Sequence, residues 1–306
     1  MSCEAIAIAL AMVMYVSSVR AWDDEGHMIV AAIAWRNLDA ASRARASQLL
    51  RLNPDYAKWI ADIAPDRRDE IAFVTASTWP DAIKRDPGYI FDGDAPSDPA
   101  AAQNIGYGDR YQHRYWHYID VPFSMDGTPL VQPATPNAET QIELFEASLR
   151  SGSLSDDVKS YDLVWLEHLV GDVHQPLHAT SRFSRQFPAG DRGGNLVALC
   201  EKPCRDELHA FWDNVLGTSK SPMTAIAEAN RIVVAADKEA AISDDRVWIG
   251  ESFEAARQDV YAAPVGAGAG PFQLDDRYQQ AARAVAQRRV ALAGARLANL
   301  IKANLR

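Results

Sequence analysis

Two pairs of histidine and aspartate share one spacing in this sequence. His168 precedes Asp172 by four residues, and His209 precedes Asp213 by four residues. On a helix, each imidazole and its carboxylate would lie on one face, about one turn apart, where they could bind one metal ion or two neighbouring ions. An isolated pair of this kind is usually an ion pair on the protein surface. His168, however, lies in the apolar segment YDLVWLEHLVGDVH, which argues against a solvated pair.

The other histidines and the missing motifs favour zinc. Imidazole together with carboxylate suits zinc in an enzyme without redox chemistry. A di-iron bundle needs two Glu-x-x-His motifs and a thermolysin-like site needs His-Glu-x-x-His, and both are absent. No Gly-rich phosphate loop or Gly-x-Ser-x-Gly elbow occurs either. The seven histidines are His27, His113, His117, His168, His174, His178 and His209.

The order of the motifs resembles a known enzyme family over roughly two-thirds of the chain. They are Trp22 with Gly26-His27, Ser77-Thr-Trp-Pro-Asp81, Trp116-His117-Tyr-Ile-Asp120, His168-Leu-Val-Gly-Asp172, His174-Gln-Pro-Leu-His178, Gly193-Gly-Asn195 and Leu208-His209-x-Phe-Trp-Asp213. Together they are similar to the zinc-dependent single-strand-specific nucleases and 3′-nucleotidases, often called the S-one/P-one family. The zinc phospholipase C enzymes are distant relatives of that family.

The resemblance implies three zinc ions in one cleft. One zinc would be held by Asp81, His117, His168 and Asp172. A second would be held by His178, His209 and Asp213. The third would be held by His27, Asp172 and the free amino group and carbonyl of Trp22. Asp172 would then bridge two ions, as in co-catalytic metal sites.

The resemblance also implies the reaction. The enzyme would hydrolyse single-stranded DNA and RNA to 5′-mononucleotides and would remove the 3′-phosphate from nucleotides. A metal-activated hydroxide would attack phosphorus, and zinc would stabilise the departing 3′-oxygen. Asp81 and Asp172 would take part through the metal, and Lys84 would add positive charge in the transition state.

Three further positions match substrate-binding residues of the family. Tyr118 would stack on a base, and Asp120 would hydrogen-bond the edge of that base. Stacking on an aromatic ring tolerates every base but needs it unpaired, which explains a preference for single strands. Asn195 would lie near the cleft. Without the resemblance, Tyr118 could equally be a core residue, and Asp120 and Asn195 could be turn residues.

Two other functions fit parts of the same pattern. A zinc phospholipase C would use the same metal cluster, but it usually carries Glu at the position of Asp213. Lys84, Tyr118 and Asp120 also favour the nuclease. A non-catalytic zinc-binding protein would differ by lacking an open coordination position.

Apolar spacing predicts that helices position these residues. We expect a mainly α, single multi-helix domain over residues 22–306, similar to phospholipase C and the nucleases, with long loops around the zinc cleft. Asp39, Asp66, Ser155 and Ser221 are predicted helix caps, 196–200 is a predicted short strand, and 86–112, 121–137, 181–195 and 263–274 are predicted loops. The predicted helices are 27–38, 39–52, 66–77, 138–150, 155–174, 205–216, 222–237, 247–262 and 275–304.

The net charge of −10 disfavours a broad basic nucleic-acid-binding face. Positive charge for a phosphate substrate must therefore be local. Bound metal is one source, and Arg182, Arg185 and Arg192 in a basic loop are another. Single-stranded DNA or RNA and 3′-nucleotides are the expected partners, and we expect a monomer without a stable protein partner.

The first residues predict export. Residues 5–16 form an apolar run with the length of a signal-peptide core, and Val19-Arg20-Ala21 suits cleavage before Trp22, although Glu4 is atypical. We therefore predict a signal peptide over residues 1–21, a secreted or periplasmic location, and no membrane span after its removal. A retained membrane anchor and a buried first helix are the alternatives. In an oxidising compartment Cys200 and Cys204 would form a disulfide; free thiols or a zinc site are the alternatives.

Overall fold

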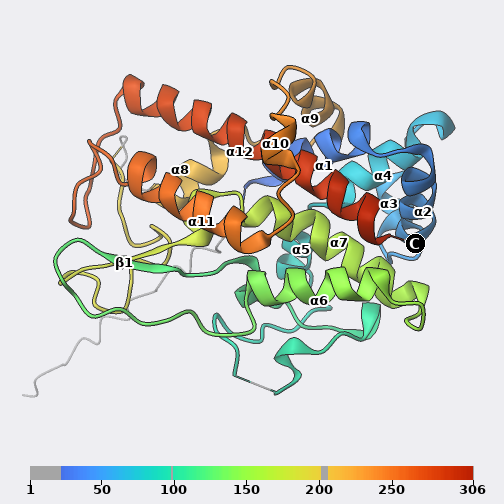
Figure 1. Ribbon diagram of the computed structural model, residues 1–306, viewed down its shortest axis with the longest axis horizontal. Coiled ribbons are helices and arrows are strands. Elements are labelled where there is room, and N and C mark those ends of the chain that lie inside the picture. The colour runs from blue at the N-terminus through green and yellow to red at the C-terminus, as the bar shows by residue number, and fades with distance from the viewer. Residues whose placement is uncertain (1–21, 98, 201–205, 306) are drawn as a thin grey trace, which may run out of the picture.

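Helices form most of the structure, as predicted, and the longest of them run lengthwise across a single mainly α domain (Figure 1). The computed structural model describes residues 22–97, 99–200 and 206–305. The longer helices are α1 (Asp24–Asn37), α2 (Ala40–Leu50), α4 (Arg68–Ala76), α6 (Ala138–Arg150), α7 (Asp156–Asp172), α8 (Leu208–Asn214), α9 (Pro222–Ala229), α11 (Asp245–Ala255) and α12 (Asp276–Asn304). Short helices are α3 (Tyr56–Trp59), α5 (Trp79–Ala82) and α10 (Asp237–Ala240). Within the described residues no helix is long and apolar enough to span a membrane.

Helix α7 lies at the centre of the fold. Every residue from Lys159 to Asp172 is buried, and the helix contacts α1, α2, α5, α6 and α12. A helix that is buried on all sides needs neighbours on all sides, which explains why the other helices surround it (Figure 1). His168 and Asp172 stand in the last turns of this helix, so the core fixes their positions.

Most predicted caps and helix ends are confirmed. The side chains of Asp39, Ser155 and Ser221 accept hydrogen bonds from backbone N–H groups of the first turn. The prediction for Asp66 is wrong, because this residue lies within a short 3₁₀ turn and α4 begins at Arg68. The predicted helix 222–237 is also too long. It ends at Ala229, and the exposed Val233 and Val234 that follow have no core to pack against.

The predicted strand 196–200 is wrong as a regular strand. Ala198 and Leu199 each form one isolated bridge, to Glu207 and Phe272 respectively. A two-stranded parallel sheet forms elsewhere, between β1 (Pro122–Ser124) and β2 (Ser181–Phe183), with Phe123 opposite Arg182. Both strands lie inside predicted loops and are only three residues long, which is too short for a periodic signal.

The long predicted loop 86–112 is attached to the core at several points. Asn104 Nδ2 donates to Asp162 Oδ2 of α7 (2.9 Å), and Trp116 Nε1 donates to the Ala101 carbonyl (3.0 Å). Gln112 Nε2 donates to the Lys84 carbonyl (3.2 Å). The loop is thereby held against the segment that carries Asp81 and Lys84.

Candidate metal centre

Eight of the nine predicted metal ligands, all except Trp22, come from six separate segments that meet at the C-terminal end of α7. Three groups of side chains place their ligand atoms within 4.8 Å of one another, and all are buried. The segments are α1, α5, α7, α8 and two short 3₁₀ turns, Arg114–His117 and Pro176–Ala179. The three groups are His117, His168 and Asp172; His178, His209 and Asp213; and His27, Asp81 and His168.

The first group has the spacing of ligands around one zinc ion. Asp172 Oδ2 lies 3.2 Å from His117 Nδ1 and 3.3 Å from His168 Nε2, and these two nitrogens lie 2.8 Å apart. Zn–N and Zn–O bonds of ~2.0–2.1 Å in a tetrahedron separate neighbouring ligand atoms by about 3.3 Å. Asp81 Oδ1 is 3.9 Å from both nitrogens, which places it as a candidate fourth ligand of this group.

The second group is formed by α8 and the turn Pro176–Ala179. The Nε2 atoms of His178 and His209 lie 3.2 Å apart. Asp213 Oδ2 is 3.5 Å from His209 Nε2, and Asp213 Oδ1 is 3.9 Å from His178 Nε2. One turn of α8 separates His209 from Asp213, as their spacing predicts.

Asp172 faces two groups at once. Its Oδ2 atom faces His117 and His168, whereas its Oδ1 atom lies 3.4 Å from His27 Nε2. His27 also stacks on His168 with ring centroids 3.8 Å apart, which explains its grouping with Asp81 and His168. Trp22 is fully buried beside these residues, and its indole N–H donates to the Gly171 carbonyl (3.0 Å). A carboxylate in this position can bridge two ions.

The polar atoms of the centre fit a bound cation. The Nδ1 atoms of His178 and His209 donate to carbonyl oxygens, so their Nε2 atoms face each other as two lone pairs. Both ring nitrogens of His27 and Asp172 Oδ1 have no hydrogen-bond partner among the described residues, although they are buried. Buried polar atoms such as the ring nitrogens of His27 and Asp172 Oδ1 are costly without a partner unless a metal ion binds them.

Burial disfavours the charged form of most of these side chains. It lowers the pKa of His27 and His117 well below the usual value and that of His168 to about 4. Burial also raises the pKa of Asp172 and Asp213 well above the usual carboxyl value. The lowered pKa keeps these imidazoles neutral, which is the form that binds a divalent cation. A bound cation would also favour the ionised form of Asp172 and Asp213, which burial disfavours.

Several groups that the sequence analysis did not identify hold the ligands in place. The backbone carbonyls of Ser77, His117 and Gly193 accept the Nδ1–H of His168, His178 and His209 respectively. Gln175 is fully buried, and its Nε2 donates to Asp213 Oδ1 (2.7 Å). Such second contacts fix the ring orientation of metal-binding histidines and the position of carboxylates. The sequence signal that could have identified Gln175 is its position between the two histidines of the motif His174-Gln-Pro-Leu-His178.

Gly171 allows His27 to reach the centre, and its replacement is our first prediction. A Cβ atom at residue 171 would lie 2.8 Å from His27 Nδ1, which is closer than real contacts allow. Gly171→Ala is therefore expected to displace His27, to remove one metal ion per chain and to lower activity about tenfold or more. Gly250→Ala, in α11 with open space around its Cβ, is the matched control. Metal analysis and kinetics of both variants provide the measurement, and full metal content in Gly171→Ala would contradict the prediction.

Of the other predicted site residues, Lys84 contacts the centre, whereas Tyr118 and Asp120 line a separate pocket. Lys84 is almost completely buried, with Nζ 2.6 Å from Asp81 Oδ1. Burial raises the pKa of Asp81, but Lys84 and His168 outweigh it, so the pKa lies below the usual value. Tyr118 and Asp120 are half-buried and line a small pocket of about 100 Å³.

Asn195 and two histidines have local roles in the structure. The Asn195 side chain donates to the Arg192 carbonyl (2.6 Å), within its own turn. His113 and His174 are fully buried but lie in other contacts: His113 stacks on Trp116 and bonds Asp109, and His174 bonds Arg296. Neither histidine belongs to a metal group among the described residues.

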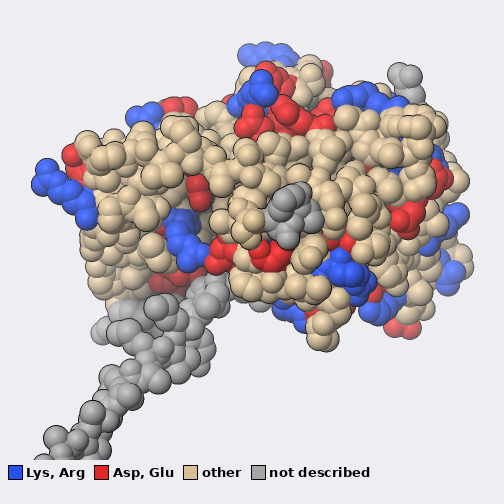
Figure 2. Space-filling view, turned by 90° about the horizontal axis from the view of Figure 1, so that it is seen from below, with Lys and Arg blue, Asp and Glu red and all other residues tan. Residues whose placement is uncertain are grey.

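The surface near the loops carries mixed charge. On the face in Figure 2, basic and acidic groups are interspersed and no continuous basic area is visible.

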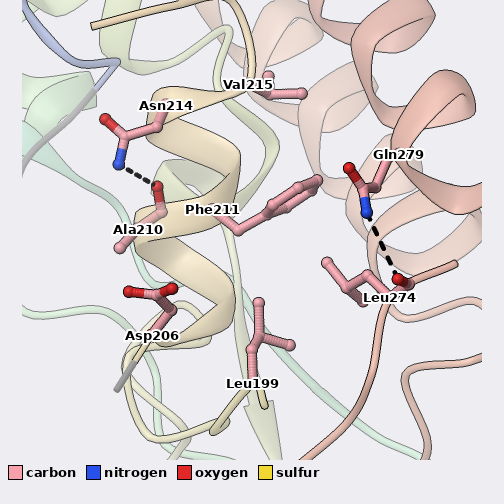
Figure 3. A pocket seen from close by; sticks show the side chains of 8 residues that line it. All are labelled: Leu199, Asp206, Ala210, Phe211, Asn214, Val215, Leu274 and Gln279. Atoms are coloured by element: carbon pink, nitrogen blue, oxygen red, sulfur yellow. Dashed lines mark hydrogen bonds between the residues drawn. The ribbon is translucent and has the colours of Figure 1, made fainter. Parts of the chain in front are cut away.

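A separate pocket lies between α8 and the residues that precede and begin α12, lined mainly by Leu199, Phe211, Val215 and Leu274 (Figure 3). It does not include His209 or Asp213, although both belong to α8. The candidate site is therefore the buried metal centre and not this pocket.

Comparison with known proteins agrees with this geometry. The S1/P1 nuclease family model matches residues 22–306. The chain is 25% identical over 222 residues to "Endonuclease 1" and 23% identical over 225 residues to "Endonuclease 4", both from Arabidopsis thaliana. These matches cover 68% and 69% of this chain but only 58% and 60% of the two relatives. Because the family match extends over the whole segment from Trp22 to the last residue, this chain belongs to the S1/P1 nuclease family.

Proposed function

We propose that this protein is a zinc-dependent endonuclease and 3′-nucleotidase with three zinc ions. It hydrolyses single-stranded DNA and RNA to 5′-mononucleotides and removes the 3′-phosphate from nucleotides. The observation that carries the proposal is Asp172, whose two oxygens face two different groups of buried histidines. Family membership and the endonuclease names of the relatives support the same activity.

The site residues have two kinds of role in the proposed reaction: some would bind the metal ions, and others would bind the substrate. Zinc bound at this centre would supply a water that ionises near neutral pH and positive charge next to the phosphate. Asp172 holds the His27 group and the His117–His168 group at a fixed separation. Lys84 places a buried ammonium beside Asp81, where its charge would help to stabilise the negative charge that develops on the phosphate in the transition state. Tyr118 and Asp120 offer a ring and a carboxyl to an unpaired base.

The test is a product analysis with four substrates. Zinc-loaded protein should release 5′-mononucleotides from single-stranded DNA and RNA and inorganic phosphate from 3′-AMP, and it should leave lecithin intact. Hydrolysis of lecithin alone would indicate a phospholipase C. Three bound zinc ions without any hydrolysis would indicate a zinc-binding protein without catalytic activity.

Replacement of Tyr118 tests the base-binding site. Tyr118→Ala is expected to weaken the binding of nucleotide substrates by ~1–3 kcal/mol, the value of one stack between a base and an aromatic ring. Hydrolysis of a small phosphodiester without a base should be unaffected. Tyr118→Phe is the matched control, because it keeps the ring and removes only the hydroxyl that donates to the Asp94 carbonyl. Equal losses with both kinds of substrate would mean that Tyr118 is structural.

Residues 1–21 and Cys204 lie outside the described residues, so the signal peptide, the export and the Cys200–Cys204 disulfide stay predictions. We propose that cleavage before Trp22 creates the amino group that completes the third zinc site. The family match, which begins at Trp22, supports this start. An amide nitrogen is a poor zinc donor, because its lone pair is delocalised into the carbonyl.

A protein that keeps residues 1–21 is therefore expected to bind two zinc ions and to lose most of its turnover. The protein that starts at Trp22 should bind three. Zinc analysis and activity of both forms provide the measurement, and circular dichroism verifies that both are folded. Equal zinc content and turnover in the two forms would contradict the role of the Trp22 amino group.

A further inference from the structure

The turn Asp191–Asn195 holds an arginine in a backbone conformation that favours glycine. The φ angle of Arg192 is +56°, and Gly193 and Gly194 follow with φ angles of +60° and +82°. A residue with a Cβ atom is disfavoured in this region, and such residues persist mainly where the surrounding structure holds them and where function uses them. An arginine at this position therefore suggests that its side chain has a function, such as binding a ligand.

Buried contacts hold the backbone of this turn in place on both sides of Arg192. The Asp191 carboxylate is fully buried and accepts a hydrogen bond from the Gly194 N–H (3.2 Å). The Gly193 carbonyl accepts the Nδ1–H of His209 (2.6 Å). The turn Asp191–Asn195 therefore both orients the metal ligand His209 and carries Arg192.

The Arg192 guanidinium lies at the rim of the Tyr118 pocket. It forms an ion pair with Asp94 across two loops (3.1 Å), and the two side chains are 51% and 41% exposed. The carbonyl of Asp94 accepts the Tyr118 hydroxyl (2.5 Å), and Asp94 lines the pocket that contains Tyr118 and Asp120. The positive charge of Arg192 also acts on both Tyr118 and Asp120.

Two other cations of this region are engaged in buried contacts. Lys84 is paired with Asp81. The Arg182 guanidinium is 2% exposed, lies 3.3 Å from Asp191 and donates to two backbone carbonyls. Arg192 differs because its partner is a surface carboxylate, and an ion pair of this kind contributes little to stability. A phosphate can replace that carboxylate, since a guanidinium binds both with two parallel hydrogen bonds.

We infer that Arg192 binds a phosphate group of the nucleic-acid strand next to the nucleotide at Tyr118, and that Asp94 occupies the guanidinium in the free enzyme. This inference rests on the proposed function and adds a phosphate subsite to it. The subsite differs from the metal centre, because the guanidinium pairs with Asp94 and not with a metal ligand. The phosphate bound by Arg192 is therefore a neighbour of the reacting one.

The two halves of the ion pair then have opposite effects on binding, which gives the test. Arg192→Gly removes the cation and suits the positive φ, so the turn should be retained. Asp94→Asn keeps the backbone contact to Tyr118 and removes the competing charge. Arg185→Ala, an exposed arginine of the same loop, is the matched control.

Binding is measured with zinc-loaded protein and a fluorescent single-stranded phosphorothioate oligonucleotide that resists hydrolysis. Arg192→Gly is expected to raise Kd three- to tenfold and to reduce the slope of log Kd against log salt by about 0.7, the value for one phosphate contact on a single strand. Asp94→Asn is expected to lower Kd about twofold or more. Arg185→Ala should leave Kd and the slope unchanged.

Two results would overturn the inference. If both Arg192→Gly and Asp94→Asn raise Kd, the ion pair only joins the loops. If Arg192→Gly binds like Arg185→Ala, Arg192 contacts no phosphate. A different result would contradict the proposed function itself: the unaltered protein would bind the oligonucleotide but release no nucleotides from ordinary single-stranded DNA.

Discussion

Removal of zinc is expected to abolish the hydrolysis of single-stranded nucleic acid and to lower Tm by about 8 °C or more. The candidate ligands belong to segments between Trp22 and Asp213 that come together at the centre, so bound ions would hold these segments together as well as form the site. A single site with free zinc at 1,000-fold Kd adds about 4 kcal/mol to the free energy of unfolding. For a domain of this size 1 kcal/mol corresponds to roughly 2–4 °C in Tm.

The measurement combines metal analysis, calorimetry and activity before and after chelation. We expect about three zinc ions per chain and recovery of activity when zinc is added back. His113→Gln is the control, since His113 is buried on Trp116 outside the metal groups and should leave the zinc content at three. One zinc or none on folded, fully active protein would refute the three-zinc centre.

The second large effect concerns the bridging carboxylate. Asp172→Asn is expected to lower kcat by more than about 100-fold and to remove two zinc ions, because both of its oxygens face ligand groups. Asp213→Asn should remove one ion and reduce activity less, because Asp213 belongs to one metal group, that of His178 and His209.

Asp162→Asn provides the matched control for this comparison. Asp162 is a buried aspartate of the same helix α7, but it bonds Asn104 and Ser148 and belongs to none of the three metal groups. This variant should keep three zinc ions and normal turnover. Equal losses in Asp172→Asn and Asp213→Asn, or an active Asp172→Asn, would remove the bridging role.

Local sequence determined the helices and the pairs of ligands that they carry. His168 and Asp172, and His209 and Asp213, lie one turn apart because both segments are helical, and a spacing of four residues can be read directly. The same reasoning gave the caps Asp39 and Ser155. It failed for the strand 196–200 and for the end of the helix that begins at Pro222, since pairing and packing with distant residues decide such short elements.

The membership of each metal group depends on residues that are far apart in sequence, so the expected groups came from the motif resemblance and not from spacing. The structure also groups His27 with Asp81 and His168, which was not expected. No periodicity relates His27 to Asp172 or Asp81 to His117, because the packing of α1 and α5 on α7 brings them together. Only the tertiary structure identified the carbonyls and Gln175 that orient the ligands. It also separated three arginines of one basic loop region: Arg182 is buried, Arg185 is exposed, and Arg192 pairs with Asp94 of the Tyr118 pocket. The physical reason is that backbone spacing sets contacts within a helix, whereas contacts between segments depend on how the whole core packs.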